Sequence, residues 1–464
     1  MNTNEIKGFF ADEAAIDRDV HVVFTYLMET AIDPAEAAAN LCRETSTAQW
    51  ARPGKGEDFR PRYAAKVLDI EIVDETAVST FGAVEPDGGR FARARVRIAH
   101  PSGNFGARIP NLLTAAMGEG AFFCHGVSAI KLLDISFPSR YLADFQGPKF
   151  GTAGIREILG VQGRPLFFGV VKPNIGLDPK SFADIAREAW LGGLDAAKDD
   201  EMLADPDYSP FAERTRLVGQ MRRNAEEATG ERKMFIANIT DEVERLKELH
   251  DIAVANGINA VMVNAMAVGL SGVRMICRHS TVPVIGHFDC IAPMSRHPNF
   301  GVSSSVFTKL QRICGCDAII MPGFGARMMT PEEEVLVNAA ECSNPLSRIK
   351  AALPVPGGSD WAGTLPLMYE KLRTHDFAMV PGRGVFGHPK GPRAGAASLR
   401  QAWEAIEQRI DLAGYAESHR ELREAIEAFG GESEKVSSEG DEGLKPYICG
   451  FTGADLSFNR NERN

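Results

Sequence analysis

The sequence contains no long apolar run, no block of basic residues and no paired cysteine motif. No apolar segment approaches the roughly 20 residues that span a bilayer, and Met1–Ala11 lacks the basic-then-apolar order of a signal peptide. We therefore expect no membrane association. The chain has 51 basic and 62 acidic residues, a net charge of -11 and no basic stripe, so nucleic-acid binding is not expected.

Cysteine is also sparse and scattered. Among the eight cysteines the closest pair, Cys314 and Cys316, is a C-x-C motif without a second pair. The cysteines thus indicate neither a zinc site nor a disulfide framework, and a reducing cytoplasm fits best. A hydrophobic content of 44% and a charged content of 24% are typical of a soluble globular protein, and 464 residues suit one large domain and one smaller domain.

Residues 1–148 predict an N-terminal α+β domain of the ferredoxin-like type. Runs rich in β-formers cover Val20–Glu29, Ala64–Asp74 and Arg93–His100. A helix after the first run begins at Asp33-Pro34, and a second helix is expected from Ile109 to Ala116. The predicted order of strand, helix, two strands, helix and strand is that of a split βαβ module.

From 149 to 428 the chain repeats an apolar strand and an amphipathic helix eight times. The predicted strands are Leu166–Val171, Leu194–Asp199, Met234–Asn238, Ala260–Asn264, Val282–Gly286, Ala318–Met321, Ala352–Pro356 and Phe377–Pro381. Nearly continuous apolar strands are typical of parallel strands covered on both faces, and eight units predict a closed (β/α)₈ barrel. A doubly wound open sheet is the alternative, but it seldom needs so many strands.

Local signals mark helix starts and the end of the predicted barrel. Asp178-Pro179 opens one helix, and Thr330-Pro331-Glu332-Glu333 predicts a capping box with proline at the first helical position. From residue 429 to 464 the composition turns to Gly, Ser, Glu and Lys, which predicts a partly flexible tail.

Polar residues stand at the ends of five successive predicted strands, where barrel enzymes carry their active sites. In chain order they are Lys172 and Asn174, then Lys198 with Asp200 and Glu201, then Asn238, Asn264 and His287. Any one could be a helix cap or a buried hydrogen-bonded group, and a charged run such as 198–201 alone favours a solvated loop. Their recurrence at corresponding places favours an active site.

The loops after the seventh and eighth strands predict a phosphate site. The seventh strand leads into Gly357-Gly358-Ser359, and the eighth leads into Gly382-Arg383-Gly384. Barrels commonly hold phosphates in these two loops, where glycines bring backbone N–H groups close and a guanidinium can pair with the anion. The chain has 45 glycines, so ordinary loop glycines are the alternative. The position in the barrel favours a phosphorylated small-molecule substrate.

Lys198 lies among carboxylates that could bind magnesium. Asp200 and Glu201 supply the oxygen ligands that Mg²⁺ prefers, but a lysine ammonium would repel the ion. A carbamate formed from the neutral amine and carbon dioxide would instead be an anionic ligand. Neighbouring carboxylates oppose the neutral amine, so metal binding must compensate. Such a metal could polarise a substrate carbonyl and stabilise an enediolate.

Two motifs resemble the signature pair of the RuBisCO large-chain superfamily. They are Gly-Gly-Leu-Asp-x-x-Lys-Asp-Asp-Glu at 192–201 and Val-Lys-Pro-x-x-Gly-Leu at 171–177. The resemblance runs to about Gln408, and the sequences at 321–325 and 380–389 look like the sixth and eighth loops of form IV RuBisCO-like proteins from photosynthetic bacteria. It implies Mg²⁺ held by carbamylated Lys198, Asp200 and Glu201.

The resemblance also implies roles for residues around that metal. Lys172 would be the acid/base lysine and His287 would lie near the substrate, while Gly358, Ser359, Gly382 and Arg383 fall at the phosphate loops. Members of the superfamily are homodimers in which the N-terminal domain of one subunit covers the barrel of the other. Glu44 and Asn104, in loops that composition alone would assign as plain turns, match the residues delivered across that interface.

Several positions depart from the carboxylases of the superfamily. Asn174 replaces a second lysine, Phe288 a phosphate-binding arginine, Ile320 a strand-six histidine, Arg327 the mobile sixth-loop lysine, and Gln49 a threonine beside Trp50. One phosphate-binding arm and the group that steadies added carbon dioxide are thereby lost. The resemblance therefore predicts no ribulose-bisphosphate carboxylation, and a substrate with a single phosphate.

Three functions stay open at this point. The first is a magnesium-dependent enolase or isomerase acting on a phosphorylated ketose-like compound, with a sulfur-containing substrate suggested by relatives in methionine salvage. The second is a decarboxylase or transcarboxylase of a phosphorylated oxo-sugar acid. The third is a non-catalytic protein of sulfur metabolism or oxidative stress, which the retention of three costly charges disfavours. Lys172 and the carbamate on Lys198 are both candidate bases.

Overall fold

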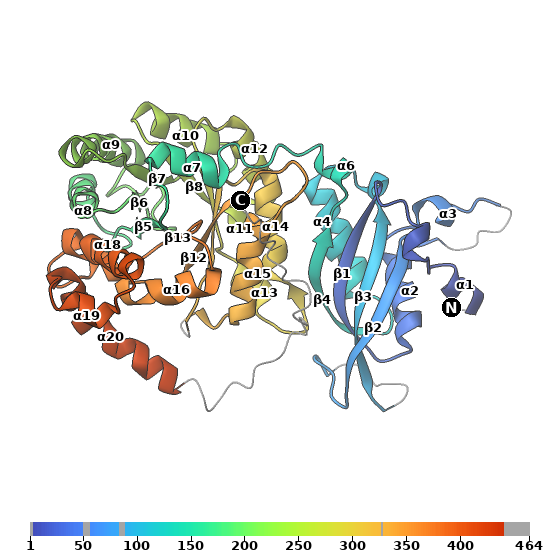
Figure 1. Cartoon of the computed structure of the whole chain (residues 1–464). Helices are drawn as coiled ribbons and strands as arrows, with labels where there is room; N and C mark the ends of the chain where they lie inside the picture. Colours follow the sequence, from blue (N-terminus) through green and yellow to red (C-terminus); the bar gives the residue numbers. More distant parts are fainter. Residues whose placement is uncertain (1–2, 50–55, 83–88, 326–327, 440–464) are drawn as a thin grey trace, which may run out of the picture.

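The computed structural model describes residues 3–49, 56–82, 89–325 and 328–439. An N-terminal domain and a barrel lie side by side (Figure 1), with the barrel helices α14 (Ser304–Cys314) and α15 (Glu332–Ser343) nearest the smaller domain. Within these described ranges, no helix has the length and apolar character that a membrane span requires.

The N-terminal domain has the predicted ferredoxin-like arrangement. Its strands are β1 (His21–Thr30), β2 (Lys66–Thr76), β3 (Phe91–Pro101) and β4 (Val127–Ser136), and its longer helices are α2 (Pro34–Glu44) and α4 (Ile109–Met117). The antiparallel order is β4-β1-β3-β2. Alternate residues of β1 are buried, and the Tyr26 hydroxyl donates to the Ala116 carbonyl at 2.8 Å, which fixes α4 on the sheet.

Short helices complete this domain. They are α1 (Thr3–Lys7), η1 (Glu13–Ala15), α3 (Arg60–Tyr63), η2 (Ser102–Asn104), α5 (Glu119–Phe122) and α6 (Ser139–Leu142). The predicted start of α2 is confirmed, because the Asp33 carboxylate accepts hydrogen bonds from the backbone N–H groups of Ala35 and Glu36.

Eight parallel strands form the barrel, as predicted. They are β5 (Leu166–Val170), β6 (Ala196–Lys198), β7 (Met234–Asn238), β8 (Ala260–Asn264), β9 (Val284–His287), β11 (Ala318–Pro322), β12 (Leu353–Gly357) and β13 (Ala378–Met379). Backbone hydrogen bonds connect them in the order β12-β11-β9-β8-β7-β6-β5-β13, and β12 packs against β13 to close the ring. Every strand overlaps its predicted range.

Helices surround this ring (Figure 1). The longer ones besides α14 and α15 are α8 (Pro179–Leu191), α9 (Phe211–Thr229), α10 (Leu246–Ala255), α12 (Leu270–His279), α16 (Leu365–Leu372), α18 (Pro392–Gln408) and α20 (Arg420–Glu439). The shorter ones are α7 (Gly151–Leu159), α11 (Ala265–Val268), α13 (Ile291–Ser295), η4 (Ala362–Thr364), α17 (Arg383–Phe386) and α19 (Leu412–Ala416).

The helix starts test the two cap predictions made for the barrel. Asp178 caps α8 as predicted, through the N–H groups of Lys180 and Ser181. The capping box at Thr330 is wrong, because its hydroxyl donates backwards to the Met328 carbonyl at 3.2 Å and Pro331 is the N-cap of α15. Helix α20 continues to Glu439, beyond the predicted start of the tail at 429, and residues 440–464 lie outside the described residues.

Alternation along the barrel strands decides which side chains face the interior. Leu166, Phe168 and Val170 of β5 belong to the apolar cluster inside the barrel, together with Ala196 of β6. Lys198 follows Ala196 by two residues and pairs with Val170 in register. The lysine side chain therefore caps the apolar interior at the carboxyl end of the strands.

One strand joins the two domains. Strand β10 (Gly301–Val302), from the barrel part of the chain, pairs in parallel with Lys131 and Leu132 of β4. The Lys131 ammonium also donates to the carbonyls of Ser295 and His297, at 2.8 Å each. A strand of two residues has no periodicity that the sequence could show, so this connection was not predicted.

Candidate active site at the carboxyl end of the barrel

Lys198 is a buried amine without a hydrogen-bond partner. Its side chain is 1% exposed, and no partner for its Nζ atom lies among the described residues. The nearest charged atom is Oε2 of Glu201, at 3.7 Å. An unpaired buried ammonium is costly, so this position favours a neutral or chemically modified amine.

The surroundings of Lys198 also favour the neutral form of its amine. Burial lowers the pKa of its amine, and it outweighs the nearby carboxylates of Glu201 and Asp200, which act to raise the pKa. The sequence analysis considered only the carboxylates and expected them to oppose the neutral amine. The pocket as a whole instead enlarges the neutral fraction, which is the form that reacts with carbon dioxide.

Lys172 connects the first and second strand ends. Its Nζ atom donates to Oδ2 of Asp200 at 2.8 Å and to Oδ1 of Asn174 at 2.6 Å. Asp200 is fully buried, whereas the Lys172 side chain is 32% exposed and can meet a ligand from the open end of the barrel. The lysine thus compensates the buried carboxylate and holds protons at the mouth of the site.

Two amides hold the turn that carries Glu201. Asn238, at the end of β7, donates to the carbonyls of Asp200 and Glu201 at 3.3 and 2.9 Å. Asn264, at the end of β8, donates to the Glu201 carbonyl at 3.1 Å, while its own buried Oδ1 atom has no partner among the described residues. The third and fourth strand ends therefore position the carboxylates by their backbone.

His287, at the end of β9, lies beside the same carboxylates. Its Nε2 atom is 3.6 Å from Oε2 of Glu201, and its Nδ1 atom is 3.4 Å from Oδ1 of Asp289. Glu201, His287 and Asp289 offer ligand atoms that all lie within 4.8 Å of one another. The ring of Phe288 stacks on His287 with centroids 4.9 Å apart, so an aromatic surface borders this part of the site.

Asp289 was missed by the sequence analysis. Burial acts to raise its pKa, but His287 and the charge of Lys198 outweigh burial and keep the pKa below 3.8. An ionised carboxylate beside His287 adds a third possible anionic ligand. The available signal was its place two residues after a strand-end histidine, the same kind of position that drew attention to Asp200.

The predicted phosphate loops lie next to Lys172. A Cβ atom on Gly382 would come within 2.7 Å of Cε of Lys172, and a Cβ atom on Gly358 would come within 2.7 Å of Cγ of Met328. A side chain at either position would therefore displace Lys172 or Met328. Ser359 has a φ of 20°, a backbone conformation that side chains rarely adopt and that is found at ligand-binding turns.

Asp360 is a second residue that the sequence analysis missed. It follows Ser359, is buried, and accepts a hydrogen bond from the backbone N–H of Val380 at 3.4 Å. Burial raises its pKa to about 7, against the opposing effect of the N–H groups of Val380 and Gly358. A carboxyl that is half protonated near neutral pH therefore underlies both phosphate loops and connects β12 to the segment after β13.

Two arginines were predicted at the site, Arg383 at the eighth loop and Arg327 in place of the sixth-loop lysine. Arg383 is exposed at the start of α17, and its guanidinium carbon lies 5.4 Å from the ring centroid of Phe429 in α20. The role of Arg383 in phosphate binding stays a prediction. Arg327 lies outside the described residues.

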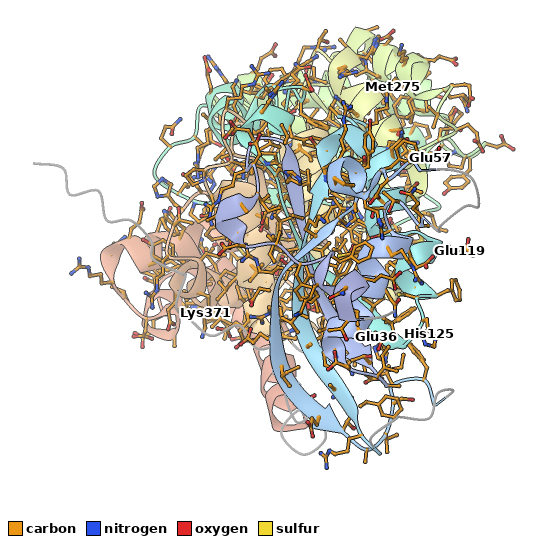
Figure 2. The ribbon with its side chains drawn as sticks, turned by 90° about the vertical axis from the view of Figure 1, so that its right-hand side faces the viewer. Glu36, Glu57, Glu119, His125, Met275 and Lys371 are labelled. Carbon is orange, nitrogen blue, oxygen red and sulfur yellow. The ribbon has the colours of Figure 1, made fainter. Side chains whose placement is uncertain are left out.

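Glu44 and Asn104 lie in the N-terminal domain, where both line a cavity of about 730 Å³. Asn104 donates to the Tyr63 carbonyl at 2.8 Å, and the Glu44 carboxylate pairs with Arg43 at 3.0 Å. Glu119 lines the same cavity and is seen at the edge of this domain in Figure 2. These contacts are all made within the N-terminal domain.

Two of the residues that differ from the carboxylases lie in or against the apolar interior of the barrel. Ile320 is 2% exposed and belongs to the apolar cluster inside the barrel, and Phe288 packs against that cluster. Gln49 holds the following loop, donating to the Glu57 carbonyl at 2.9 Å, while Trp50 lies outside the described residues. The described part of the site thus has an apolar surface at two places where a carboxylase of the superfamily carries a charged or polar group.

The residues fit a divalent metal with oxygen ligands. Glu201 and Asp289 offer carboxylate oxygens beside His287, and the Lys198 Nζ atom lies 3.7 Å from Glu201 without a hydrogen-bond partner among the described residues. The Asp200 carboxylate accepts from Lys172 instead. Lys198, Asp200 and Glu201 would hold Mg²⁺ once the lysine carries a carbamate, with His287 and Asp289 alongside.

Comparisons with known proteins identify the family to which the two domains belong. Residues 151–429 match the family model of the ribulose bisphosphate carboxylase large chain, catalytic domain, and residues 9–141 match the model of its N-terminal domain. A ribulose bisphosphate carboxylase-like protein of Chlorobaculum tepidum is 56% identical over 427 residues, which cover 92% of this chain and 98% of the relative.

More distant relatives share the full length of the fold. A 3-oxo-isoapionate-4-phosphate decarboxylase of Rhizobium rhizogenes is 32% identical over 412 residues, covering 88% of this chain and 98% of that protein. The crystal structure of an octameric ribulose-1,5-bisphosphate carboxylase/oxygenase from Pyrococcus horikoshii superposes with a TM-score of 0.83 at 29% identity, covering 92% and 97% of the two chains.

Proposed function

The chain belongs to the ribulose bisphosphate carboxylase large-chain family and is one of its RuBisCO-like proteins, and on that premise we propose that it is a magnesium-dependent enolase or isomerase. Its substrate is a phosphorylated ketose-like compound. The observation that carries the proposal is the buried, unpartnered Nζ atom of Lys198 beside Glu201. A carbamate on this atom would complete an anionic ligand set that the amine itself cannot provide.

The metal supplies one part of the chemistry. Lys198 as carbamate, Asp200 and Glu201 would hold Mg²⁺, which would polarise the substrate carbonyl and make the neighbouring C–H bond more acidic. The amide donors Asn238 and Asn264 fix the backbone carbonyl of Glu201. This support lets the carboxylate keep its place while a ligand enters.

Lys172 handles protons at the open side of the site. Its Nζ atom donates to Asp200 and Asn174 at the same time, so in the free protein it holds protons that it can give to an oxygen of the substrate. Its Nζ atom bonds Asp200, and its Cε atom lies close to Gly382 of the eighth loop. A carbamate oxygen of Lys198 could take the proton next to the carbonyl directly, whereas Lys172 could take it only after giving one of its own protons to the substrate oxygen or to solvent. Both remain candidate bases.

The phosphate end of the substrate lies at Gly358, Ser359 and Gly382. The two glycines leave room for close approach of an anion to the backbone, and Lys172 lies against Gly382. The opposite end meets Phe288 and the apolar surface that includes Ile320. This polarity fits a substrate with one phosphate and an apolar or sulfur-containing far end. Among the described residues, Phe288 and Ile320 supply no cation for a second phosphate, so ribulose-bisphosphate carboxylation is not expected.

We also propose that the active protein is a cytoplasmic homodimer with a shared site. Glu44 and Asn104 line a cavity of the N-terminal domain and bond to residues of that domain, which supports their delivery to the barrel of a second copy. The seven described cysteines are free thiols, which fits a reducing compartment.

A solvent-exchange experiment tests the proposal. Wild-type protein would be incubated in D₂O with a panel of ketose monophosphates, Mg²⁺ and bicarbonate, and NMR would follow loss of the C–H signal next to the carbonyl. We expect exchange that disappears without Mg²⁺ and in Lys198→Ala. Exchange equal in wild type and Lys198→Ala, or none with any ketose phosphate, would overturn the assignment.

A decarboxylase is the second candidate, and the likeness to the Rhizobium decarboxylase favours it. The same metal and carbonyl chemistry would then break a carbon–carbon bond to a carboxylate. Release of carbon dioxide from a phosphorylated oxo-sugar acid, measured under the same conditions, distinguishes it from isomerisation. If Mg²⁺ fails to bind and no substrate of either class reacts, a non-catalytic role would replace both.

A further inference from the structure

A second cluster of metal-ligating side chains lies outside the active site. It consists of His250 and Asp251 in α10 and His279, the last residue of α12. Because α12 leads into the amino end of β9, His279 lies at the end of the barrel opposite to Lys198. The two helices pack against each other on the outside of the barrel (Figure 1).

The three side chains already converge on one point. Oδ1 of Asp251 lies 2.7 Å from Nδ1 of His250 and 2.7 Å from Nε2 of His279. The two imidazole rings are nearly perpendicular, with centroids 4.9 Å apart. All three ligand atoms lie within 4.8 Å of one another. Two helices thus present two nitrogen atoms and one carboxylate to the same small volume.

Ser280 can accept a hydrogen bond from the His250 ring. Its hydroxyl donates to the Val282 carbonyl at 2.6 Å, and its oxygen lies 3.0 Å from Nε2 of His250. A proton on Nε2 would therefore be accepted by this oxygen. The other tautomer also has partners, because the backbone N–H of Thr281 donates to Nε2 at 3.4 Å and a proton on Nδ1 would be donated to Asp251.

These contacts suit His250 for binding a metal through Nδ1. With a metal in place of an Nδ1 proton, the ring would carry its proton on Nε2 and donate it to the Ser280 oxygen. Such an outer hydrogen bond orients a metal-bound histidine. The carboxylate of Asp251, 2.7 Å from Nδ1, would then bind the same metal as the ring.

We propose that His250, Asp251 and His279 form a zinc site that clamps α10 to α12. Two imidazoles and one carboxylate are ligands that zinc accepts, and a water molecule would complete four-coordination. Nitrogen ligands favour Zn²⁺ over Mg²⁺, so the site differs in kind from the active site. Nothing in the proposal depends on the proposed function.

The geometry needs only a small adjustment to hold the ion. Zn–N bonds of about 2.0–2.1 Å in a tetrahedron separate ligand atoms by about 3.3 Å, so Asp251 must withdraw slightly from the two nitrogens. Its side chain is 61% exposed and free to move, whereas His250 is 2% exposed and fixed. His279 lines a solvent-open cavity of about 570 Å³, which provides an entry path.

The surrounding charge opposes the ion and makes the test informative. Lys149 donates to the carbonyls of Arg278 and Ser280 beside the cluster, and Arg278 and Arg274 line the same cavity as His279. A weak, purely electrostatic cation site would not survive next to these groups. Only coordination by the two histidine nitrogens would hold a metal there.

The experiment uses full-length protein freed of metal by a chelator and then titrated with Zn²⁺ alone, or with Co²⁺ as a coloured substitute. The variants are Asp251→Asn and His279→Gln, both partly exposed, with His125→Gln as the matched control. His125 lies in the N-terminal domain, far from Met275 of α12 in Figure 2. Circular dichroism checks that each variant is folded.

We expect wild type and His125→Gln to bind one more Zn²⁺ than the two cluster variants, or to bind it at least about tenfold more tightly. Co²⁺ should give visible bands of a four-coordinate site that the cluster variants lack. Any binding at the active site is shared by all four proteins and cancels in the comparison. Equal stoichiometry, affinity and Co²⁺ spectra in wild type and both cluster variants would show a proton-bonded helix contact and overturn the proposal.

Discussion

Replacing Lys198 by methionine should make the metal-free protein more stable while abolishing its activity. The Nζ atom of Lys198 has no hydrogen-bond partner in the described structure, and methionine fills nearly the same volume without a polar atom. The acidic neighbours do not lose their main partners, because Asp200 stays paired with Lys172 and Asp199 with Arg214. Glu201 loses its nearest positive charge, and Asp289 and Asp200 lose a weaker influence of the same charge.

The size of the effect follows from two opposing contributions. An unpaired buried polar group costs roughly 1–3 kcal/mol. The attraction between Lys198 and Glu201 offsets part of this, but Glu201 is 30% exposed and the atoms are 3.7 Å apart, so it contributes about 0–1 kcal/mol. A net gain of about 1–2 kcal/mol would raise the unfolding midpoint by roughly 1–3 °C.

Lys233→Met is the matched control for this measurement. Lys233 is also buried, but its Nζ atom donates to Glu231 at 2.6 Å and to the Leu194 carbonyl at 3.0 Å. Its replacement leaves a buried carbonyl unpaired and should lower stability by about 1–3 kcal/mol. The measurement is the thermal unfolding midpoint of each variant and of wild type, all without metal. A lower midpoint for Lys198→Met would mean that its amine is satisfied in solution, and the reasoning would fail.

Three further predictions concern the site. Gly382→Ala should reduce activity at least about tenfold, because the new Cβ would lie 2.7 Å from Cε of Lys172 and displace that side chain. The control variant Gly431→Ala, where the new Cβ meets no atom within 4 Å, should keep its activity. Steady-state kinetics of the folded variants tests this, and equal activities would contradict it. Uptake of labelled carbon dioxide at Lys198, followed by NMR, should rise with pH and reach its plateau below pH 10.5, the ordinary pKa of a lysine, because burial lowers the pKa of this amine. A plateau at or above pH 10.5 would exclude the lowered pKa. Mixing inactive Glu44→Gln and Lys198→Ala proteins should restore about a quarter of wild-type activity if the site is shared, and no recovery after subunit exchange would refute sharing.

The barrel could be predicted because its strands carry an unambiguous signal. Met234–Asn238 and Ala260–Asn264 are continuous apolar runs, and both strands have those limits in the structure. Thr330 shows where local signals fail. Its capping pattern is as good as that of Asp178, but the hydroxyl finds a carbonyl in the preceding loop, a choice that depends on the path of the chain before it.

The site was predictable as a set of strand ends but not as an electrostatic environment. Spacing identified Lys198 and Glu201, yet the sign of the pKa shift at Lys198 depends on burial by the barrel interior, which no local pattern shows. Asp289 and Asp360 were missed for a related reason. Each is one acidic residue in a loop, and its contact with His287 or with the N–H of Val380 exists only after the barrel has closed.

Strand β10 covers part of the outer edge of the small domain's sheet. With β10 in place, Lys131 and Leu132 of β4 have their backbone groups covered by Gly301 and Val302. A fragment ending before the barrel would leave β4 as a bare outer strand, with the Lys131 ammonium deprived of two carbonyl partners. An exposed strand edge is a template for pairing with another copy. The fragment should therefore self-associate more readily than the intact chain, in which β10 covers this part of β4.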